Sequence, residues 1–261
     1  MLSLIEQNRG RRPGNRWSRR DVLQIGTLGL TGMTLADLLR ARAGGAEQST
    51  PTKKTSVILL FLEGGASQFE TFDPKSEAPV EIRSPLGSIS TRLPGVEFGS
   101  QFPQMAQVAD RLAIVRSFTH SDGWDHHKNI IPSCEFLCPP LDGAVAAFID
   151  DVRQRGLDEQ VLLIITGEFG RTPRMNKNAG RDHWAPINPL ILAGGGLRMG
   201  QTIGASDSHG AYPRERPVLP EDLMATCFHV LGVEQDLQYV HPSGRPISMI
   251  HGDGRPIQEL L

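Results

Sequence analysis

The sequence predicts an α/β protein built around a sheet of parallel strands. Short apolar runs alternate with amphipathic helical patterns along the chain, and polar loops follow the runs. This alternation is typical of parallel sheets, because a helix is the usual crossover between parallel strands. The chain has 261 residues, of which 39% are hydrophobic and 21% charged, enough for one domain with a substantial core.

Residues 1–43 are predicted to form a twin-arginine signal segment and residues 44–55 a linker. The pair Arg19-Arg20 precedes a weakly apolar run and a small-residue A-x-A site at 41–43. This order is typical of export of folded proteins to the periplasm or cell envelope through the twin-arginine machinery. Charged residues interrupt the run too early for a spanning helix, so the mature protein should have no transmembrane span. An uncleaved amphipathic helix is the alternative.

The remainder of the chain is acidic. Residues 1–43 hold eight arginines and three acids; subtracting them from 27 basic and 29 acidic residues leaves 19 and 26, a net charge of about −7. Residues 44–261 are acidic overall and have no row of basic residues, which argues against nucleic-acid binding. Three cysteines form no disulfide framework. Cys134 and Cys138 could pair, but buried free thiols are favoured.

The predicted strands are four apolar runs. The first, "SVILLFLEGG" from Ser56, is continuous and ends in glycines, which predicts a strand buried on both faces. The others follow in the order Leu112–Ser117, Val161–Thr166 and "PLILAGGG" from Pro189.

Three helices are predicted between and after these strands. A helical pattern lies around Gln101–Asp110. The stretch "PPLDGAVAAFIDDVRQRGL" has one apolar face, with prolines marking its start and Gly156 its end. "PEDLMATCFHVLG" begins with proline and acids and ends at Gly232.

The polar loops that follow the strands are the expected place for chemistry, because ligands of such sheets bind beyond the strands' carboxyl ends. Asp125, His126 and His127 form the densest group of candidate ligands, and His183 could add a third ligand from another loop. Nitrogen and oxygen donors of this kind suit a divalent metal such as zinc, which would activate a water or a substrate oxygen. Alternatively, the Asp125-His126-His127 triplet is a chance combination in a surface loop.

Further candidates are acidic and basic residues at the same strand ends. Acids that could bind a metal, form turns or cap helices are Glu63, Glu70, Asp73 and Glu168. Basic residues that could bind an anionic substrate or pair with those acids are Arg171, Arg174 and Arg181.

Several phrases in order resemble a known family. They include "SRRDVLQIGTLGL", "LLFLEGGASQFETFDP", "GWDHHKN", "ITGEFGRTPRMN", "GRDHW" and "GASDSHGAYP". Together they resemble domain of unknown function 1501, an exported branch related to the sulfatase and alkaline phosphatase superfamily. The resemblance covers nearly the whole chain. It implies a three-layer α/β/α sandwich, reduced in size and forming a single shortened domain over residues 56–261. It also implies metal-dependent hydrolysis of phosphate or sulfate esters.

The resemblance also implies roles for individual residues. Asp125, His127 and His183 are similar to the ligands of one superfamily metal site. Glu168-Phe169 stands where the superfamily usually has Asp-His, so Phe169 removes one ligand and Glu168 is a possible one. Glu63 lies near the position of the first-strand acid, with Glu70 as an alternative.

One departure from the family is large. The phrases that normally flank a long segment are joined directly at "HSDGWDHH". The absent segment would contain the nucleophile region, so Thr119 or Ser121 would have to substitute. Three hypotheses follow: an exported metal-dependent hydrolase of anionic esters, a non-catalytic metal- or ligand-binding envelope protein, and a non-functional deletion product.

Overall fold

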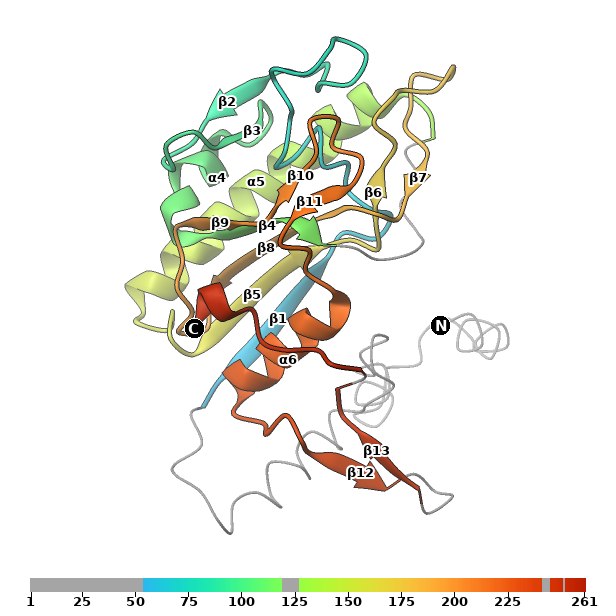
Figure 1. Ribbon diagram of the computed structural model, residues 1–261. Coiled ribbons are helices and arrows are strands. Elements are labelled where there is room, and N and C mark those ends of the chain that lie inside the picture. Colours follow the sequence, from blue (N-terminus) through green and yellow to red (C-terminus); the bar gives the residue numbers. More distant parts are fainter. Residues whose placement is uncertain (1–53, 119–126, 241–244, 251) are drawn as a thin grey trace, which may run out of the picture. The chain divides into compact units, whose positions relative to one another are not determined.

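The structure, a computed structural model, describes residues 54–118, 127–240, 245–250 and 252–261 (Figure 1). The chain divides into two compact units. The described residues of the smaller unit lie within Val233–Met249, where β12 (Gln238–Val240) pairs antiparallel with β13 (Pro246–Ser248). The larger comprises Lys53–Gly232 and Ile250–Leu261 and contains the main sheet.

The main sheet has five strands in the order β1-β5-β8-β4-β9 (Figure 1). Their bounds are β1 Ser56–Phe61, β5 Val161–Thr166, β8 Asn188–Gly194, β4 Ala113–Phe118 and β9 Gln201–Ile203. β1 is parallel to β5 and β4 to β9, whereas β8 is antiparallel to both of its neighbours. The α/β prediction is confirmed as a mixed sheet, and the prediction of a mainly parallel one is wrong for β8.

The connection that precedes β8 explains its direction. Between Thr166 and Asn188 the chain forms a loop with two short antiparallel strands, β6 (Gly170–Arg171) and β7 (His183–Trp184). Parallel neighbours need a crossover, usually a helix, whereas a chain that turns back on itself returns antiparallel. The "PLILAGGG" run is therefore a strand as predicted, but reversed.

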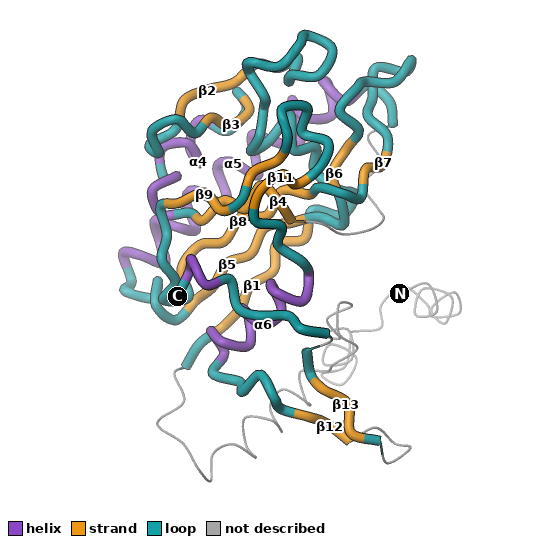
Figure 2. The backbone as a smooth tube through the Cα atoms, in the orientation of Figure 1, coloured by secondary structure: helices purple, strands orange, loops and turns teal. Residues whose placement is uncertain are grey.

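Helices lie on both faces of the sheet (Figure 2). Alternate side chains of a strand point to opposite faces, and in β5 they enter two separate clusters. Leu163 and Ile165 pack with α4 (Pro103–Gln107) and α5 (Ile130–Gln154), and Leu162 and Ile164 pack with α6 (Pro220–Leu231). Because β5 and β8 are covered on both sides, the core of the unit is centred on them.

β1 differs from its prediction. It is an edge strand with β5 as its neighbour, and Ile58 and Phe61 are 41% and 43% exposed. The expectation of burial on both faces is wrong, because an apolar run reports the side chains' preference and not the strand's position in the sheet.

The helix boundaries are partly as predicted. α6 ends at Gly232, whose φ of 68° provides the left-handed conformation that ends many helices. α5 begins nine residues before Pro139, so Pro139 and Pro140 lie inside the helix and not at its start. The pattern at 101–110 is a short α4 followed by the 3₁₀ turn η1 (Ala109–Arg111).

The remaining elements are short. The pairs are β2 (Ser88–Ser90) with β3 (Glu97–Gly99) and β10 (Ala205–Ser206) with β11 (Pro213–Glu215), and η2 (Gln258–Leu260) lies near the C-terminus. Over the described ranges, no helix combines the length and apolarity needed to cross a bilayer.

Candidate functional site: an imidazole pair

Two of the predicted metal ligands meet. His127, which precedes α5, and His183, in β7, place their Nε2 atoms 2.9 Å apart, although 56 residues separate them in sequence. Their rings lie 4.5 Å apart between centroids. The loop after β4 and the loop after β5 therefore converge, as the sequence predicts for polar turns at one rim of the sheet.

The loop at 176–180 holds His127 next to His183. Asn176 donates from Nδ2 to the His127 carbonyl at 3.1 Å. The backbone N–H groups of Asn129 and Ile130 donate to the carbonyls of Asn178 and Ala179. Gly180 makes the approach possible, since a Cβ atom there would lie 2.2 Å from the His127 carbonyl carbon. The glycine of the "GRDHW" phrase is thus required by the close approach of two backbones.

Asp182 orients the first imidazole. Its Oδ1 lies 2.7 Å from His127 Nδ1 and also accepts a hydrogen bond from Asn176 at 3.0 Å. The His127 hydrogen bond, followed by that from Asn176, lowers the pKa of Asp182 below its usual value. An ionised carboxylate only accepts, so His127 carries a proton on Nδ1 and turns Nε2 toward His183.

The spacing of the two nitrogens fits a shared cation. Two nitrogens bound to zinc at about 2.0–2.1 Å lie roughly 2.9–3.4 Å apart at angles between a right angle and the tetrahedral value. A carboxylate on the far nitrogen of a metal-binding histidine is a common arrangement. Within the described residues, however, no third His, Cys, Asp or Glu completes a group of three.

Phe169 stands beside this pair. Its ring is fully buried and stacks on His183 with centroids 4.4 Å apart. Glu168 accepts a hydrogen bond at Oε2 from the Gly64 N–H at 2.8 Å, so it ties the loop after β1 to the loop after β5. Glu63 is exposed. The roles of Glu168 and Glu63 as ligands stay predictions.

Of the three arginines that could bind an anion, Arg171 and Arg181 are fully buried and Arg174 is exposed. Arg171 donates to the carbonyls of Gly64 and Arg181 at 2.9 and 2.8 Å, and Arg181 donates to the carbonyls of Thr172, Pro173 and Ile82. Both guanidinium groups therefore tie loops of the site together in this structure. Their anion-binding role stays a prediction.

Glu70, the alternative first-strand acid, is engaged elsewhere. It is fully buried, and its Oε1 lies 3.2 Å from an Arg181 nitrogen. The Arg181 guanidinium also lies over the Phe69 ring, 4.3 Å from its centroid. Glu70 is thus one partner of a buried ion pair.

The remaining candidates lie outside the described residues. These are Thr119, Ser121, Asp125 and His126. Their predicted roles as nucleophile or ligands stay predictions.

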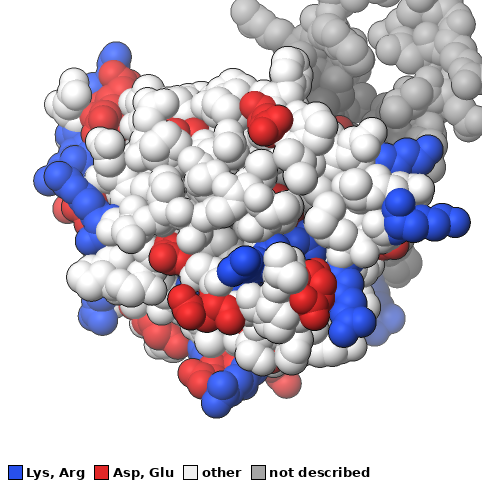
Figure 3. All heavy atoms as spheres, turned by 90° about the horizontal axis from the view of Figure 1, so that it is seen from above, with Lys and Arg blue, Asp and Glu red and all other residues white. Residues whose placement is uncertain are grey.

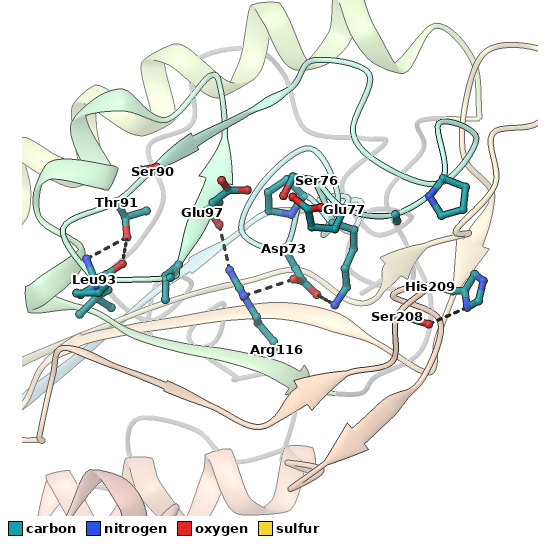
Figure 4. Close-up of a pocket in the computed structure, with 17 residues that line it drawn as sticks. Asp73, Ser76, Glu77, Ser90, Thr91, Leu93, Glu97, Arg116, Ser208 and His209 are labelled. Atoms are coloured by element: carbon teal, nitrogen blue, oxygen red, sulfur yellow. Dashed lines mark hydrogen bonds and ion pairs between the residues drawn. The ribbon is translucent and has the colours of Figure 1, made fainter.

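A separate cavity of about 940 Å³ opens beside the loop after β1 (Figure 4). Its floor carries Asp73, which lies 3.1 Å from Lys75 Nζ, 3.5 Å from Arg116 and 2.6 Å from the Ser206 hydroxyl. Figure 4 shows Arg116 reaching between Asp73 and Glu97. Asp73, a candidate acid from the sequence, is therefore held in an ionic network, and neither His127 nor His183 lines this cavity.

The charges on the face drawn in Figure 3 are mixed. Basic and acidic side chains of the described residues alternate around its margin, and its middle is largely uncharged. This face offers no continuous field of one sign to a ligand.

Comparison with known proteins supplies the family. Residues 54–123 and 119–261 match the sequence model of the family described as "Protein of unknown function (DUF1501)". The chain belongs to the DUF1501 family. The resemblance to domain of unknown function 1501 is thereby confirmed. No curated protein matches this DUF1501 chain.

Among solved structures, a phosphonate monoester hydrolase, SpPMH from Silicibacter pomeroyi, matches over 47% of this chain with 19% sequence identity and a TM-score of 0.27. The match spans 20% of that hydrolase chain.

Two residues around the imidazole pair received no role from the sequence, Asn176 and Gly180, and Asp182 was noted only as an acid next to His183. The signal was present, since "NKNAGRDH" combines an asparagine, a glycine and an acid directly before His183. Only the docking of this loop on His127 shows what they do.

Proposed function

We propose that this DUF1501 chain is an exported, sulfatase- and alkaline-phosphatase-like protein that binds a divalent cation and hydrolyses phosphate or sulfate esters. His127 and His183 bind the cation through Nε2, and Asp125, two residues before His127, is the third ligand. Asp182 holds the His127 ring from behind. Glu168 and Glu63 are the further acids available at the same strand ends.

One observation carries the proposal: the 2.9 Å approach of the two Nε2 atoms, with Asp182 on the opposite nitrogen of His127. A hydrogen bond between the imidazoles alone would account for the distance. The metal interpretation adds that a carboxylate on the far nitrogen of a histidine, here Asp182 on Nδ1 of His127, is the arrangement that metal-binding histidines commonly have.

A divalent cation in this position would polarise an ester oxygen and lower the pKa of a bound water. Other residues of the chain would keep the two histidines in position. Asp182 keeps the Nδ1 proton on His127, Gly180 allows the two segments to approach, and the buried arginines fix the loops around them. Thr119 or Ser121 follows β4 and is the candidate nucleophile.

The proposal includes a shortened superfamily fold. The two segments that match the family overlap at residues 119–123, where "VRSFTHSD" joins "GWDHH". This is the place at which the long intervening segment is proposed to be absent. Helices on both faces of the sheet support a reduced α/β/α arrangement.

A non-catalytic metal-binding protein is the second candidate, and Phe169 favours it. An aromatic ring packed on His183 occupies the place expected for another imidazole. One cation could then be bound without the second that a two-metal hydrolase uses. A deletion product with no function is the third candidate.

The test is metal analysis of the purified chain together with turnover of aryl phosphates and aryl sulfates. We expect about one equivalent of divalent metal in the wild type and its loss in His183→Ala. Asp182→Asn should weaken metal binding by about 10–100-fold, because it removes the charge behind His127. Asp151→Asn, an exposed acid on α5, is the matched control.

The outcomes separate the three candidates. Bound metal with turnover supports the hydrolase, and bound metal without turnover supports the binding protein. If the wild type binds no metal, or if His183→Ala binds as much as the wild type, the imidazole pair is not a metal site.

A further inference from the structure

Among the strands that the structure describes, β1 is an unusual edge of the sheet. The other edge strand of the sheet, β9, has three residues, whereas β1 has six and no charged residue, proline or bulge. Natural proteins usually shorten, charge or cover such edges, because an open apolar strand pairs with another chain. An edge of this kind in a folded chain indicates an interaction surface.

The hydrogen bonds show which residues face outward. Ser56 N–H donates to Gln160 O at 2.7 Å, and Leu62 N–H donates to Thr166 O at 2.8 Å. In a parallel ladder, alternate residues bond to the same neighbour. The even-numbered residues of β1 thus face β5, while Val57, Leu59 and Phe61 direct their N–H and C=O groups to the other side, where the described residues contribute no strand.

Apolar surface borders this edge on both faces of the sheet. Leu60 packs on the side of α5, and Leu59 packs on the side of α6. By the same alternation Ile58, 41% exposed, lies on the α5 side and Phe61, 43% exposed, on the α6 side. A strand added to β1 would cover both side chains.

We infer that β1 pairs with β1 of a second copy of the chain, antiparallel and about a two-fold axis through Leu59. A two-fold axis normal to the sheet keeps the α5 faces together, and it requires residues of equal parity to lie opposite each other. Val57 then faces Phe61 of the second copy, and Leu59 faces Leu59. Their outward groups form the hydrogen-bonded pairs of an antiparallel ladder.

Charge at the ends of β1 favours this direction. Exposed Lys54 precedes the strand and exposed Glu63 follows it. Antiparallel pairing brings the lysine end of one copy to the glutamate end of the other, whereas parallel pairing would bring like charges together. The residues of β1 between Lys54 and Glu63 are uncharged, so no like charges lie opposite each other when the two copies pair.

The experiment is a measurement of mass in solution for the full-length chain by sedimentation over a range of concentrations. The wild type should sediment as a dimer of twice the 28.6 kDa chain mass. Ile58→Lys places two lysines near the axis on one face and should raise the dimer dissociation constant by about 10-fold or more. Val80→Lys, at an apolar position 75% exposed and outside β1, is the matched control and should remain dimeric.

A second pair of variants separates strand pairing from apolar adhesion. Phe61→Pro removes an outward N–H and keeps the bonds to β5, whereas Phe61→Ser removes the ring and keeps the N–H. Strand pairing predicts a monomer for the proline variant and a weakened dimer for the serine variant, with unchanged circular dichroism. A monomeric wild type overturns the inference, as do an Ile58→Lys dimer equal to the Val80→Lys control and equal effects of proline and serine.

Discussion

At the scale of single residues, the imidazole pair depends on a glycine that binds nothing. Gly180 is predicted to be important for metal binding, because any Cβ there collides with the backbone at His127. Gly180→Ala should separate the two rings and weaken metal binding at least about 10-fold, comparable to loss of a residue that orients a ligand. Metal content and zinc titration of the purified variant measure this.

Gly143→Ala is the control for that substitution. Gly143 lies inside α5, where a Cβ would meet only the flexible end of Gln104 at 3.3 Å. Alanine there should leave metal binding unchanged and improve helix propensity. Equal metal binding by Gly180→Ala and Gly143→Ala would show that the approach of the two loops is not what creates the site.

The cysteines give a second prediction at this scale. All three thiols are free and buried, as the sequence favoured. Burial raises the pKa of Cys227 to about 12, and a hydrogen bond with Cys138, together with burial, raises that of Cys134. A thiol with a pKa of about 12 has a thiolate fraction near pH 8 about 1,000-fold lower than an ordinary thiol, and the thiolate is the reactive form.

Ellman's reagent should therefore modify the native chain far more slowly than the chain in guanidinium chloride, where all three thiols become accessible. Rapid labelling of Cys227 in the native state would contradict its burial on α6. The same comparison on Cys227→Ser assigns the slow phase.

The sequence predicted which loops carry the histidines that meet, but it did not predict which side chains hold those loops together. Histidines at strand ends could be paired because strand ends meet at one rim. The pairing of Arg181 with Glu70 is the alternative that the sequence left open. The full burial of Arg171 and Arg181 was not predicted, since exposed arginines and arginines that hold loops have the same sequence signature. Only the carbonyls around them distinguish the two roles.

At the scale of elements, periodicity located strands and helices but not their neighbours. Val161–Thr166 and Pro220–Leu231 were predicted nearly to the residue, because an apolar period and a terminal glycine are local signals. The direction of β8 and the edge position of β1 depend on which strands hydrogen-bond. That choice is made over long sequence separations, so no local pattern encodes it.

The prolines inside α5 give a prediction for this scale. Pro139 is exposed and cannot donate to the carbonyl four residues earlier, so it weakens the helix without filling the core. Pro139→Ala should stabilise the chain by about 2 kcal/mol, the helix penalty of proline less the entropy it removes from the unfolded state. Guanidinium denaturation measures the change.

Pro220→Ala is the matched comparison. Pro220 occupies the first turn of α6, where the missing N–H has no helical partner to lose. It should therefore give no gain in stability. If both substitutions have the same effect, the position of Pro139 inside the helix does not determine its contribution.

At the scale of the whole molecule, the topology bears on the proposed export through the twin-arginine route. β1 pairs with β5 across the intervening β4 and α5, and β4 lies between β8 and β9. Such a sheet closes only after most of the chain is available. This topology suits the proposed route for folded proteins, which Arg19 and Arg20 predict.

Replacing both Arg19 and Arg20 with lysine should therefore keep the chain in the bacterial cytoplasm, because the twin-arginine route reads the arginine pair and not its charge. Fractionation of cells that express the full chain measures the distribution. The same change at Arg11 and Arg12, outside the pair, preserves charge equally and should leave export intact. Export of both variants would assign the segment to a route for unfolded chains, and the sheet would then have to form after translocation.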